Sequence, residues 1–255
     1  EEVRSALAIP RSIEVVTGAA SPFDSAQADC AIIATPPATH FALVSEALAR
    51  GMHVLVETPM VTNIKEAEAL AALAAQSQTV VMVGYQYLYN DHVRSLKRWL
   101  ETRGGDSGRV FFHMLAEHAV SPERPDVSVL WDAGPHALAI HAFLFGSERV
   151  EEACGVHGSA TPPGHAATTI ASVRFDRGPM LTLSLSWRGA RKQRRVTFVG
   201  EGAEAVFDES NPAGALLVDD GTGLGPRPIE SLGAMAEQSS TALREPLRNE
   251  LDHFF

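Results

Sequence analysis

Residues 29–84 read DCAIIATPPATHFALVSEALARGMHVLVETPMVTNIKEAEALAALAAQSQTVVMVG, and this segment carries the clearest signal of the fold class. Short β-branched runs alternate in it with stretches of helical spacing: 29–35, 37–51, 53–56, 63–78 and 79–84. In the first helical stretch Phe41, Val44 and Leu48 share one face, and Gly51 follows as a stop signal. Strand, helix, strand, helix, strand predicts a parallel sheet with helices on both faces, half of a doubly wound domain.

The pattern changes after residue 105. Most of the later segments alternate apolar and polar residues with a period of two, which predicts strands: 109–117, about 150–156, 168–175, 180–187, 195–199 and 203–207. One helix interrupts them at about 130–145, and the Gly-rich segment 219–228 is typical of a loop. We therefore expect a partial, Rossmann-like α/β domain over 1–88, followed by an α+β domain with an open, mostly antiparallel sheet over 89–255.

The composition is that of a globular protein, with 45% hydrophobic and 20% charged residues among 255. No stretch is apolar for long enough to span a membrane, and the first residues lack the basic and apolar regions of a secretion signal, so we predict a soluble, cytoplasmic protein. The formal net charge of -10 argues against nucleic-acid binding. Two cysteines, Cys30 and Cys154, without metal-ligand spacing predict neither a disulfide framework nor a metal site.

One segment of the chain is basic, in contrast to the acidic composition as a whole. It reads WRGARKQRRV over residues 187–196 and contains five cationic side chains: Arg188, Arg191, Lys192, Arg194 and Arg195. Such a run is more often a solvated face or the rim of an oligomer contact. The alternative is that it meets an anionic substrate or a cofactor phosphate.

Ligands of an open parallel sheet bind beyond the carboxyl ends of its strands. Three such ends occur here, at 35–40 (TPPATH), 57–59 (ETP) and 84–87 (GYQY). We expect these ends to converge on one crevice. Tyr85 and Tyr87 in the last of them either form a wall of the crevice or simply pack, and the sequence does not separate the two.

Four segments in register resemble the Gfo/Idh/MocA oxidoreductases, the glucose-fructose oxidoreductase and inositol dehydrogenase group. They are Ala34-Thr35-Pro36 with His40 on the following helix, the 51–59 segment GMHVLVETP, Gly84-Tyr85-Gln86, and the 132–136 segment DAGPH. Their order and separations agree with the family from about residue 25 to 146. The sheet-rich remainder fits the second domain of that family.

The resemblance implies an NAD(P)-dependent oxidoreductase that transfers a hydride at a CH–OH carbon of a sugar, cyclitol or related polyol. It makes His136 the acid/base, Asp132 its partner and Thr58 a weak substitute donor, while the nicotinamide end of NAD or NADP is lined by Thr35, Pro36, His40, Glu57 and Gln86. It also implies a homo-oligomer that associates through the sheet of the second domain. A purely structural reading of His136, as a cap or packed polar group, stands beside this one.

Two departures from the family bear on activity. No G-x-G-x-x-G fingerprint precedes the first strand, either because roughly 60 residues, two βα units, precede Glu1 in a longer protein or because this version never had them. Thr58 also occupies the position of the family's lysine, and the loss of a positioned electrostatic donor typically costs about 100- to 1,000-fold in rate. A degenerate member that acts as a binding or oligomeric subunit, and a non-redox isomerase or lyase that uses His136, therefore stay open as alternatives.

Overall fold

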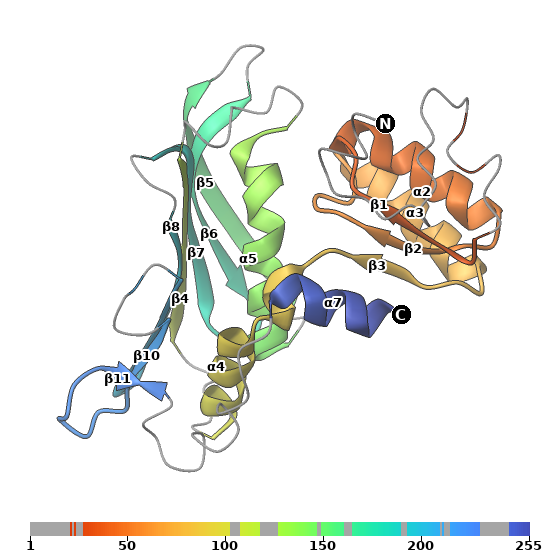
Figure 1. Ribbon diagram of the computed structural model, residues 1–255. Helices are drawn as coiled ribbons and strands as arrows, with labels where there is room; N and C mark the ends of the chain where they lie inside the picture. Colours follow the sequence, from red (N-terminus) through yellow and green to blue (C-terminus); the bar gives the residue numbers. More distant parts are fainter. Residues whose placement is uncertain are drawn as a thin grey trace.

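The residues that the structure describes form two sheets, one small and parallel, the other large and mostly antiparallel (Figure 1). A computed structural model describes residues 21, 23, 28–102, 108–117, 127–146, 149–160, 165–189, 193–209, 211, 215–229 and 245–255. Arg191 and Lys192 of the basic run lie outside the described residues, as does the segment 1–20.

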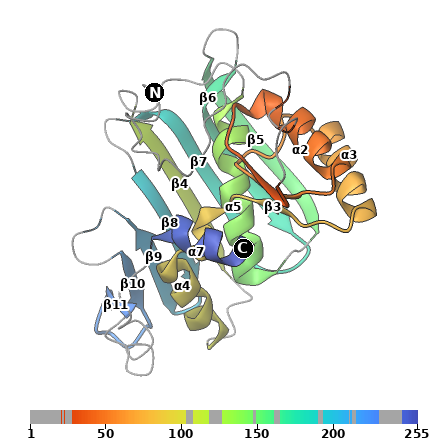
Figure 2. The ribbon, with the colours of Figure 1, turned by 45° about the vertical axis from the view of Figure 1, so that its right-hand side comes forward.

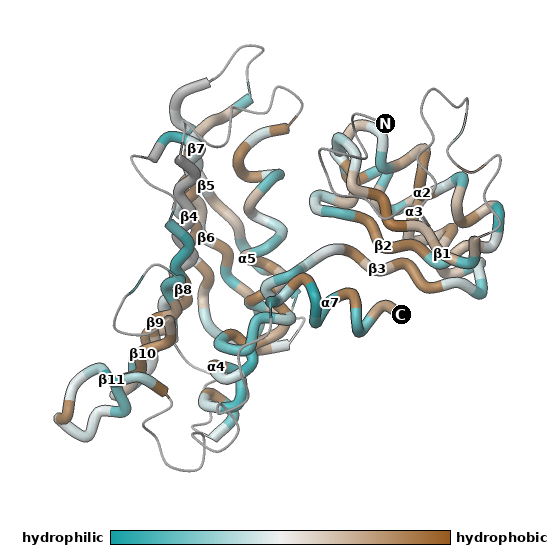
Figure 3. Tube along the Cα trace, viewed as in Figure 1, coloured by the Kyte–Doolittle hydropathy of each residue, from teal (hydrophilic) through white to brown (hydrophobic). Residues whose placement is uncertain are grey.

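The small sheet has the strand order β1-β2-β3, and both pairs of neighbours are parallel. Its elements are β1 (Cys30–Ile33), η1 (Pro37–Thr39), α2 (His40–Ala49), β2 (His53–Val56), α3 (Ile64–Gln76) and β3 (Val81–Val83). Apolar residues concentrate in β2 and β3 (Figure 3), as expected for strands of a covered sheet. The alternation in the sequence therefore predicted these strands and helices correctly.

Coverage of the small sheet differs from the expectation of helices on both faces. Helices α2 and α3 contact each other, so the two lie over the same face of the sheet. Ile33 and Val44 belong to the core beneath them, whereas the next residue on β1, Ile32, points to the opposite face and is 52% exposed. In the part of the chain that the structure describes, helices thus cover one face of this sheet.

The large sheet has eight strands in the order β11-β10-β9-β8-β4-β7-β6-β5. Their bounds are β4 (Arg109–Glu117), β5 (Val150–Ala160), β6 (Ala166–Phe175), β7 (Met180–Gly189), β8 (Gln193–Gly200), β9 (Ala203–Asp208), β10 (Leu216–Asp219) and β11 (Arg227–Pro228). All neighbours are antiparallel except β4 and β7. The loop expected at 219–228 is bounded by β10 and β11, which are too short to leave a periodic signal in the sequence.

Helices α4 (Asp91–Glu101) and α5 (Val129–Phe145) pack on one face of the large sheet, and the opposite face carries no described helix (Figure 1). Helix α5 begins where the Ser128 hydroxyl accepts a hydrogen bond from the Trp131 amide at 3.3 Å. Leu181, Leu183 and Leu185, alternate residues of β7, form the core beneath it. This packing fixes the position of α5, the helix that carries His136.

The connection between the sheets is the short helix η2 (Gln86–Tyr89), which lies between β3 and α4. Helix α7 (Pro246–Phe254) packs against η2, and the Asn249 side-chain amide donates to the Tyr89 carbonyl oxygen at 3.1 Å. Figure 2 shows α7 beside α4 and α5 from a second direction. The boundary expected between residues 88 and 89 falls inside η2, and the division into two domains stays a prediction.

Candidate active site

His136 and Thr58 meet between the two sheets. Thr58 follows β2 directly, and His136 lies in the second turn of α5. The Thr58 Oγ1 and His136 Nε2 atoms are 3.1 Å apart, a hydrogen-bond distance whose donor depends on the imidazole tautomer. Two residues 78 positions apart in the sequence are therefore adjacent, as the resemblance implied.

The imidazole of His136 lies between two tyrosine rings. The ring centroid of Tyr85 is 6.0 Å away and that of Tyr87 is 5.4 Å away, both in edge-on geometry. Burial, and next the nearby charge of Arg194, lower the pKa of His136 to about 4. The ring is therefore neutral at pH 7, and its buried Nδ1 atom has no hydrogen-bond partner. A neutral imidazole is able to accept a proton.

Asp132 lies one turn before His136 on α5. Its Oδ2 atom accepts a hydrogen bond from the indole Nε1 of Trp187, on β7, at 3.2 Å. This bond anchors the carboxylate to the inner face of the large sheet. The role of Asp132 as partner of His136 stays a prediction.

The ends of β1 and β2 carry the side chains expected to line the nicotinamide end. Thr35 and Pro36 are exposed after β1, and the Thr35 hydroxyl lies 2.7 Å from that of Thr39. Because the Thr39 hydroxyl donates to the Pro36 carbonyl oxygen at 2.8 Å, Thr35 is the donor to Thr39. This pair gives the loop after β1 a defined shape.

Glu57 and Gln86 follow β2 and β3. The Glu57 carboxylate lies over the end of β3, since a Cβ atom added at Gly84 would be 3.2 Å from Glu57 Oε2. Gln86 is half-buried in η2. Contact of either side chain with a cofactor stays a prediction.

The placement of His40 corrects the expectation that it lines the crevice. Its side chain is fully buried, with Nδ1 2.9 Å from the Pro59 carbonyl oxygen and Nε2 2.8 Å from the Thr35 carbonyl oxygen. The ring thus ties the loop after β1 to the loop after β2. His40 therefore supports the edge of the sheet from within and does not face a ligand. The sequence did not predict this, because a histidine at a helix start gives no signal of such burial.

Three further residues help to form the site; the sequence left the roles of Tyr87 and Arg194 open and did not point to Trp131. The Trp131 indole on α5 donates to the Val61 carbonyl oxygen at 2.6 Å and so joins the two sheets a second time. Tyr87, for which two interpretations were open, packs and is 5% exposed. Arg194 lies with its guanidinium carbon 5.5 Å from the Tyr87 ring centroid. The basic run is therefore not wholly a solvated face.

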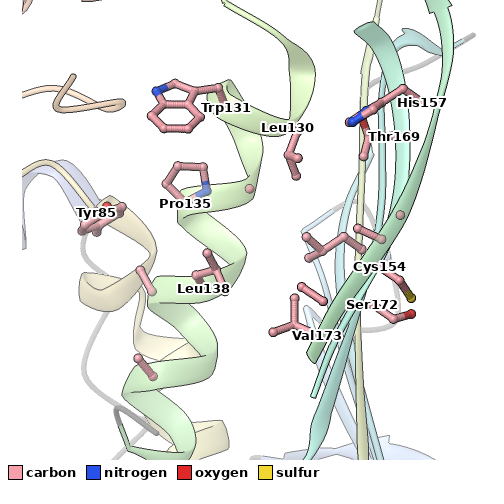
Figure 4. Close-up of a pocket in the computed structure, with 17 residues that line it drawn as sticks. Tyr85, Leu130, Trp131, Pro135, Leu138, Cys154, His157, Thr169, Ser172 and Val173 are labelled. Carbon is pink, nitrogen blue, oxygen red and sulfur yellow. The ribbon is translucent and has the colours of Figure 1, made fainter. Parts of the chain in front are cut away.

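A cavity of about 730 Å³ lies between α5 and strands β5 and β6 (Figure 4). The lining is largely apolar and includes Leu130, Leu138 and Val173. Its polar members include His157, whose Nδ1 atom lies 2.9 Å from the Thr169 hydroxyl oxygen. The residues expected around a common hollow, Thr35, Glu57, Gln86 and His136, are not part of this lining. Tyr85, whose ring lies edge-on to His136, belongs to this lining, as do Trp131 and Pro135.

Within the described residues, no group of three or more His, Cys, Asp or Glu side chains is arranged to hold a metal ion. No helix in that same part of the chain is long and apolar enough to cross a membrane.

Comparison with known families bears on both halves of the chain. The family described as "Oxidoreductase family, NAD-binding Rossmann fold" matches residues 2–85, and the "GFO/IDH/MocA C-terminal domain" matches residues 100–206. The chain belongs to the Gfo/Idh/MocA oxidoreductase family. A UDP-N-acetylglucosamine 3-dehydrogenase of Acidithiobacillus ferrooxidans is 28% identical over 190 residues, which are 73% of this chain and 57% of that protein.

A further relative and a solved structure are similar to this chain. A myo-inositol dehydrogenase of Streptomyces leeuwenhoekii is 27% identical over 197 residues, covering 73% of this chain and 59% of that protein. The structure of an inositol dehydrogenase homolog from Azotobacter vinelandii, complexed with NADH and myo-inositol, superposes with a TM-score of 0.70 at 22% identity, over 78% of this chain and 55% of that one. The chain spans a little over half the length of these relatives.

Proposed function

We propose that this protein is an NAD(P)-dependent oxidoreductase that acts on a CH–OH group of a sugar, cyclitol or related polyol. The observation that carries the proposal is the contact between His136 and Thr58, which brings an acid/base side chain to the carboxyl edge of a parallel sheet. In folds of this kind that edge is where the ligand binds. The relatives named as inositol and UDP-N-acetylglucosamine dehydrogenases support the same class of substrate.

His136 takes the proton of the substrate hydroxyl as the CH–OH group is oxidised. Since burial and Arg194 hold its pKa near 4, the imidazole is unprotonated at any pH above about 5 and can take this proton, as a weaker base than an ordinary histidine. Thr58, at hydrogen-bond distance from His136 Nε2, orients the ring through this contact. A neutral hydroxyl supplies no positive charge, so we expect slow turnover compared with a site that holds a lysine.

The cofactor NAD or NADP, when bound, accepts or supplies the hydride. The residues that fit its nicotinamide end are Thr35 and Pro36, which are exposed beyond β1, and Glu57 beyond β2. His40 supports them from below by holding both loops through their carbonyl oxygens. For the phosphates, the printed sequence contains no G-x-G-x-x-G before β1.

The open face of the large sheet supports a homo-oligomer, and we place the protein in the cytoplasm. Val156 on β5 and Ile170 on β6 are paired across the strands and are 67% and 52% exposed. Paired apolar side chains on a sheet face without a described helix favour association of two copies. An Ile170→Glu variant should shift the molar mass, measured by light scattering, toward the monomer, and an unchanged mass would speak against this face.

The cofactor proposal is tested by titrating NADH or NADPH with protein and following nicotinamide fluorescence. A saturable change supports it, and no change at millimolar cofactor overturns it. For the acid/base role, turnover of a polyol panel is measured in wild type and in His136→Ala, with circular dichroism to check the fold. Loss of turnover in a folded variant supports the role of His136, whereas a wild-type rate would make the residue structural.

A further inference from the structure

Arg194 is the member of the basic run that faces inward. It lies on β8 with the same parity as Val196 and Phe198, which are buried in the core, so its side chain belongs to the face of the sheet that α4 and α5 cover. The side chain is 23% exposed. The next residue, Arg195, points to the opposite face and is exposed. Adjacent arginines therefore lie in different environments.

The ring of Tyr87 contacts both Arg194 and the acid/base residue His136. Its guanidinium carbon lies 5.5 Å from the Tyr87 ring centroid, and that centroid lies 5.4 Å from the His136 ring at an interplanar angle of 82°. Burial first and the charge of Arg194 second lower the pKa of His136, so the guanidinium is close enough to disfavour its protonation. Strand β8, helix η2 and helix α5 thus bring three functional side chains together.

Each of these three side chains has a buried polar atom without a hydrogen-bond partner: Arg194 Nε, Tyr87 Oη and His136 Nδ1. Burial raises the pKa of the Tyr87 hydroxyl, and the adjacent Arg194 guanidinium lowers it in part through its charge and a side-chain contact. The distance and angle of that contact do not make it a hydrogen bond. Unpartnered polar atoms are uncommon in protein interiors and destabilising. Three such atoms on neighbouring side chains indicate a place built for a polar ligand.

The charge of Arg194 is only partly balanced. Its Nη1 atom is 3.8 Å from Glu209 Oε2, beyond hydrogen-bond distance, and the Glu209 side chain is 39% exposed. A solvent-exposed ion pair of this length contributes little. A guanidinium with a free buried donor is instead suited to a carboxylate or phosphate oxygen.

We propose that Arg194 and Tyr87 form a subsite beside His136 that binds an anionic group of the substrate, a carboxylate, so that the substrate is a sugar acid. This inference rests on the proposed function, since it places the reacting hydroxyl at His136. The Arg194 Nε–H and the Tyr87 hydroxyl donate to the anion, while the reacting CH–OH group lies toward Thr58. A neutral polyol leaves both donors unpaired and binds more weakly.

The test measures binding by calorimetry, without cofactor or turnover, and compares glucuronate with glucose. We expect glucuronate to bind wild type more tightly than glucose, and Arg194→Gln to weaken glucuronate roughly 10- to 100-fold with little effect on glucose. Arg194→Lys should retain part of the affinity because the charge remains. Arg195→Gln, one residue away on the exposed face, is the matched control and should bind as wild type does. Glucose 6-phosphate forms a second arm that separates a phosphate from a carboxylate as the preferred anion.

Equal affinity of wild type for glucuronate and glucose would overturn the subsite, and so would an equal loss in Arg195→Gln. Preference for glucose 6-phosphate over glucuronate would overturn the assignment of a carboxylate. If Arg194→Gln does not fold, Arg194→Lys and Tyr87→Phe carry the comparison, and wild-type affinity for glucuronate in both variants would overturn the proposal. Because no nicotinamide cofactor is present, Arg194-dependent binding without any NADH binding would retain the subsite and remove the oxidoreductase function.

Discussion

The Trp131 indole donates a hydrogen bond to the Val61 carbonyl oxygen at 2.6 Å, so helix α5 of the large sheet holds the loop that follows β2. Trp131→Phe keeps an aromatic ring but removes this donor and leaves the carbonyl without it. We expect a loss of about 1–2 kcal/mol in the free energy of unfolding, measured in urea. Because the bond joins the two sheets, their unfolding should also become less concerted in calorimetry.

Trp187→Phe is the matched control for this prediction. It removes another indole donor, to Asp132, but that bond lies entirely between β7 and α5 of the same sheet layer. Its loss should lower stability without uncoupling the two sheets. An unchanged midpoint and a single sharp transition in Trp131→Phe would show that the bond does not couple them.

His40 makes a second prediction possible. Its two ring nitrogens lie at hydrogen-bond distance from the carbonyl oxygens of Thr35 and Pro59, and the side chain is fully buried. His40→Phe fills a similar volume but makes neither contact, so we expect a loss of about 2–4 kcal/mol in stability. In urea titrations this variant should unfold well before wild type, and any NADH affinity should fall because the two loops lose their common support. Wild-type values for both would contradict the role of His40 as a tie between the loops.

Much of the fold was predictable because its signals are local. The alternation of β-branched runs and helical spacing over 29–84 reports directly on the small sheet, whereas the meeting of Thr58 with His136 was implied by the resemblance to the family. Burial of an individual polar ring is different. Nothing near His40 in the sequence distinguishes a ring enclosed between two loops from one that faces a ligand, since the enclosing atoms are backbone carbonyl oxygens 5 and 19 residues away.

The inward orientation of Arg194 could have been predicted from the alternation of residues along β8. A run of charges reads as a solvated face when it is taken as a block, but β8 continues into Val196 and Phe198, whose alternation marks the core side of the strand. Residues two and four positions apart share a face, so Arg194 had to point inward and Arg195 outward. The closeness of Arg194 to Tyr87 was beyond reach, because it depends on how η2 packs under α5.

The lowered pKa of His136 predicts how stability depends on pH. Burial first and Arg194 second lower it from 6.5 to about 4, so between these values the unfolded chain binds more protons than the folded one. Stability from this group therefore rises with pH across the window, by about 2 kcal/mol between pH 5 and pH 7.5. His136→Gln should lose this contribution to the slope in urea titrations at the two pH values. The same slope in variant and wild type would mean that His136 titrates normally.

The raised pKa of Glu250 predicts that its contribution to stability falls as pH rises, opposite to that of His136. Burial first and the Glu57 carboxylate second raise its pKa from 4.5 to about 7, and its buried Oε1 atom has no hydrogen-bond partner. Here the folded chain binds more protons than the unfolded one, so stability from this group is present below pH 4.5 and is lost as pH rises toward 7. Glu250→Gln should therefore be more stable than wild type at pH 7.5, by about 1–2 kcal/mol after allowance for solvent screening, and lose that advantage at pH 5.

Because the contributions of His136 and Glu250 offset each other, the wild-type profile hides both, and only the single variants expose them. Glu245→Gln, at the residue just before the same helix, is the control for Glu250, since Glu245 is exposed and its side chain makes no capping hydrogen bond. Urea titrations at pH 5 and pH 7.5 give two free energies of unfolding for each protein, and thus four for a variant and wild type together. A stability gain of Glu250→Gln that is equal at both pH values would mean that the carboxyl group is already ionised at pH 5, so that burial and Glu57 do not raise its pKa.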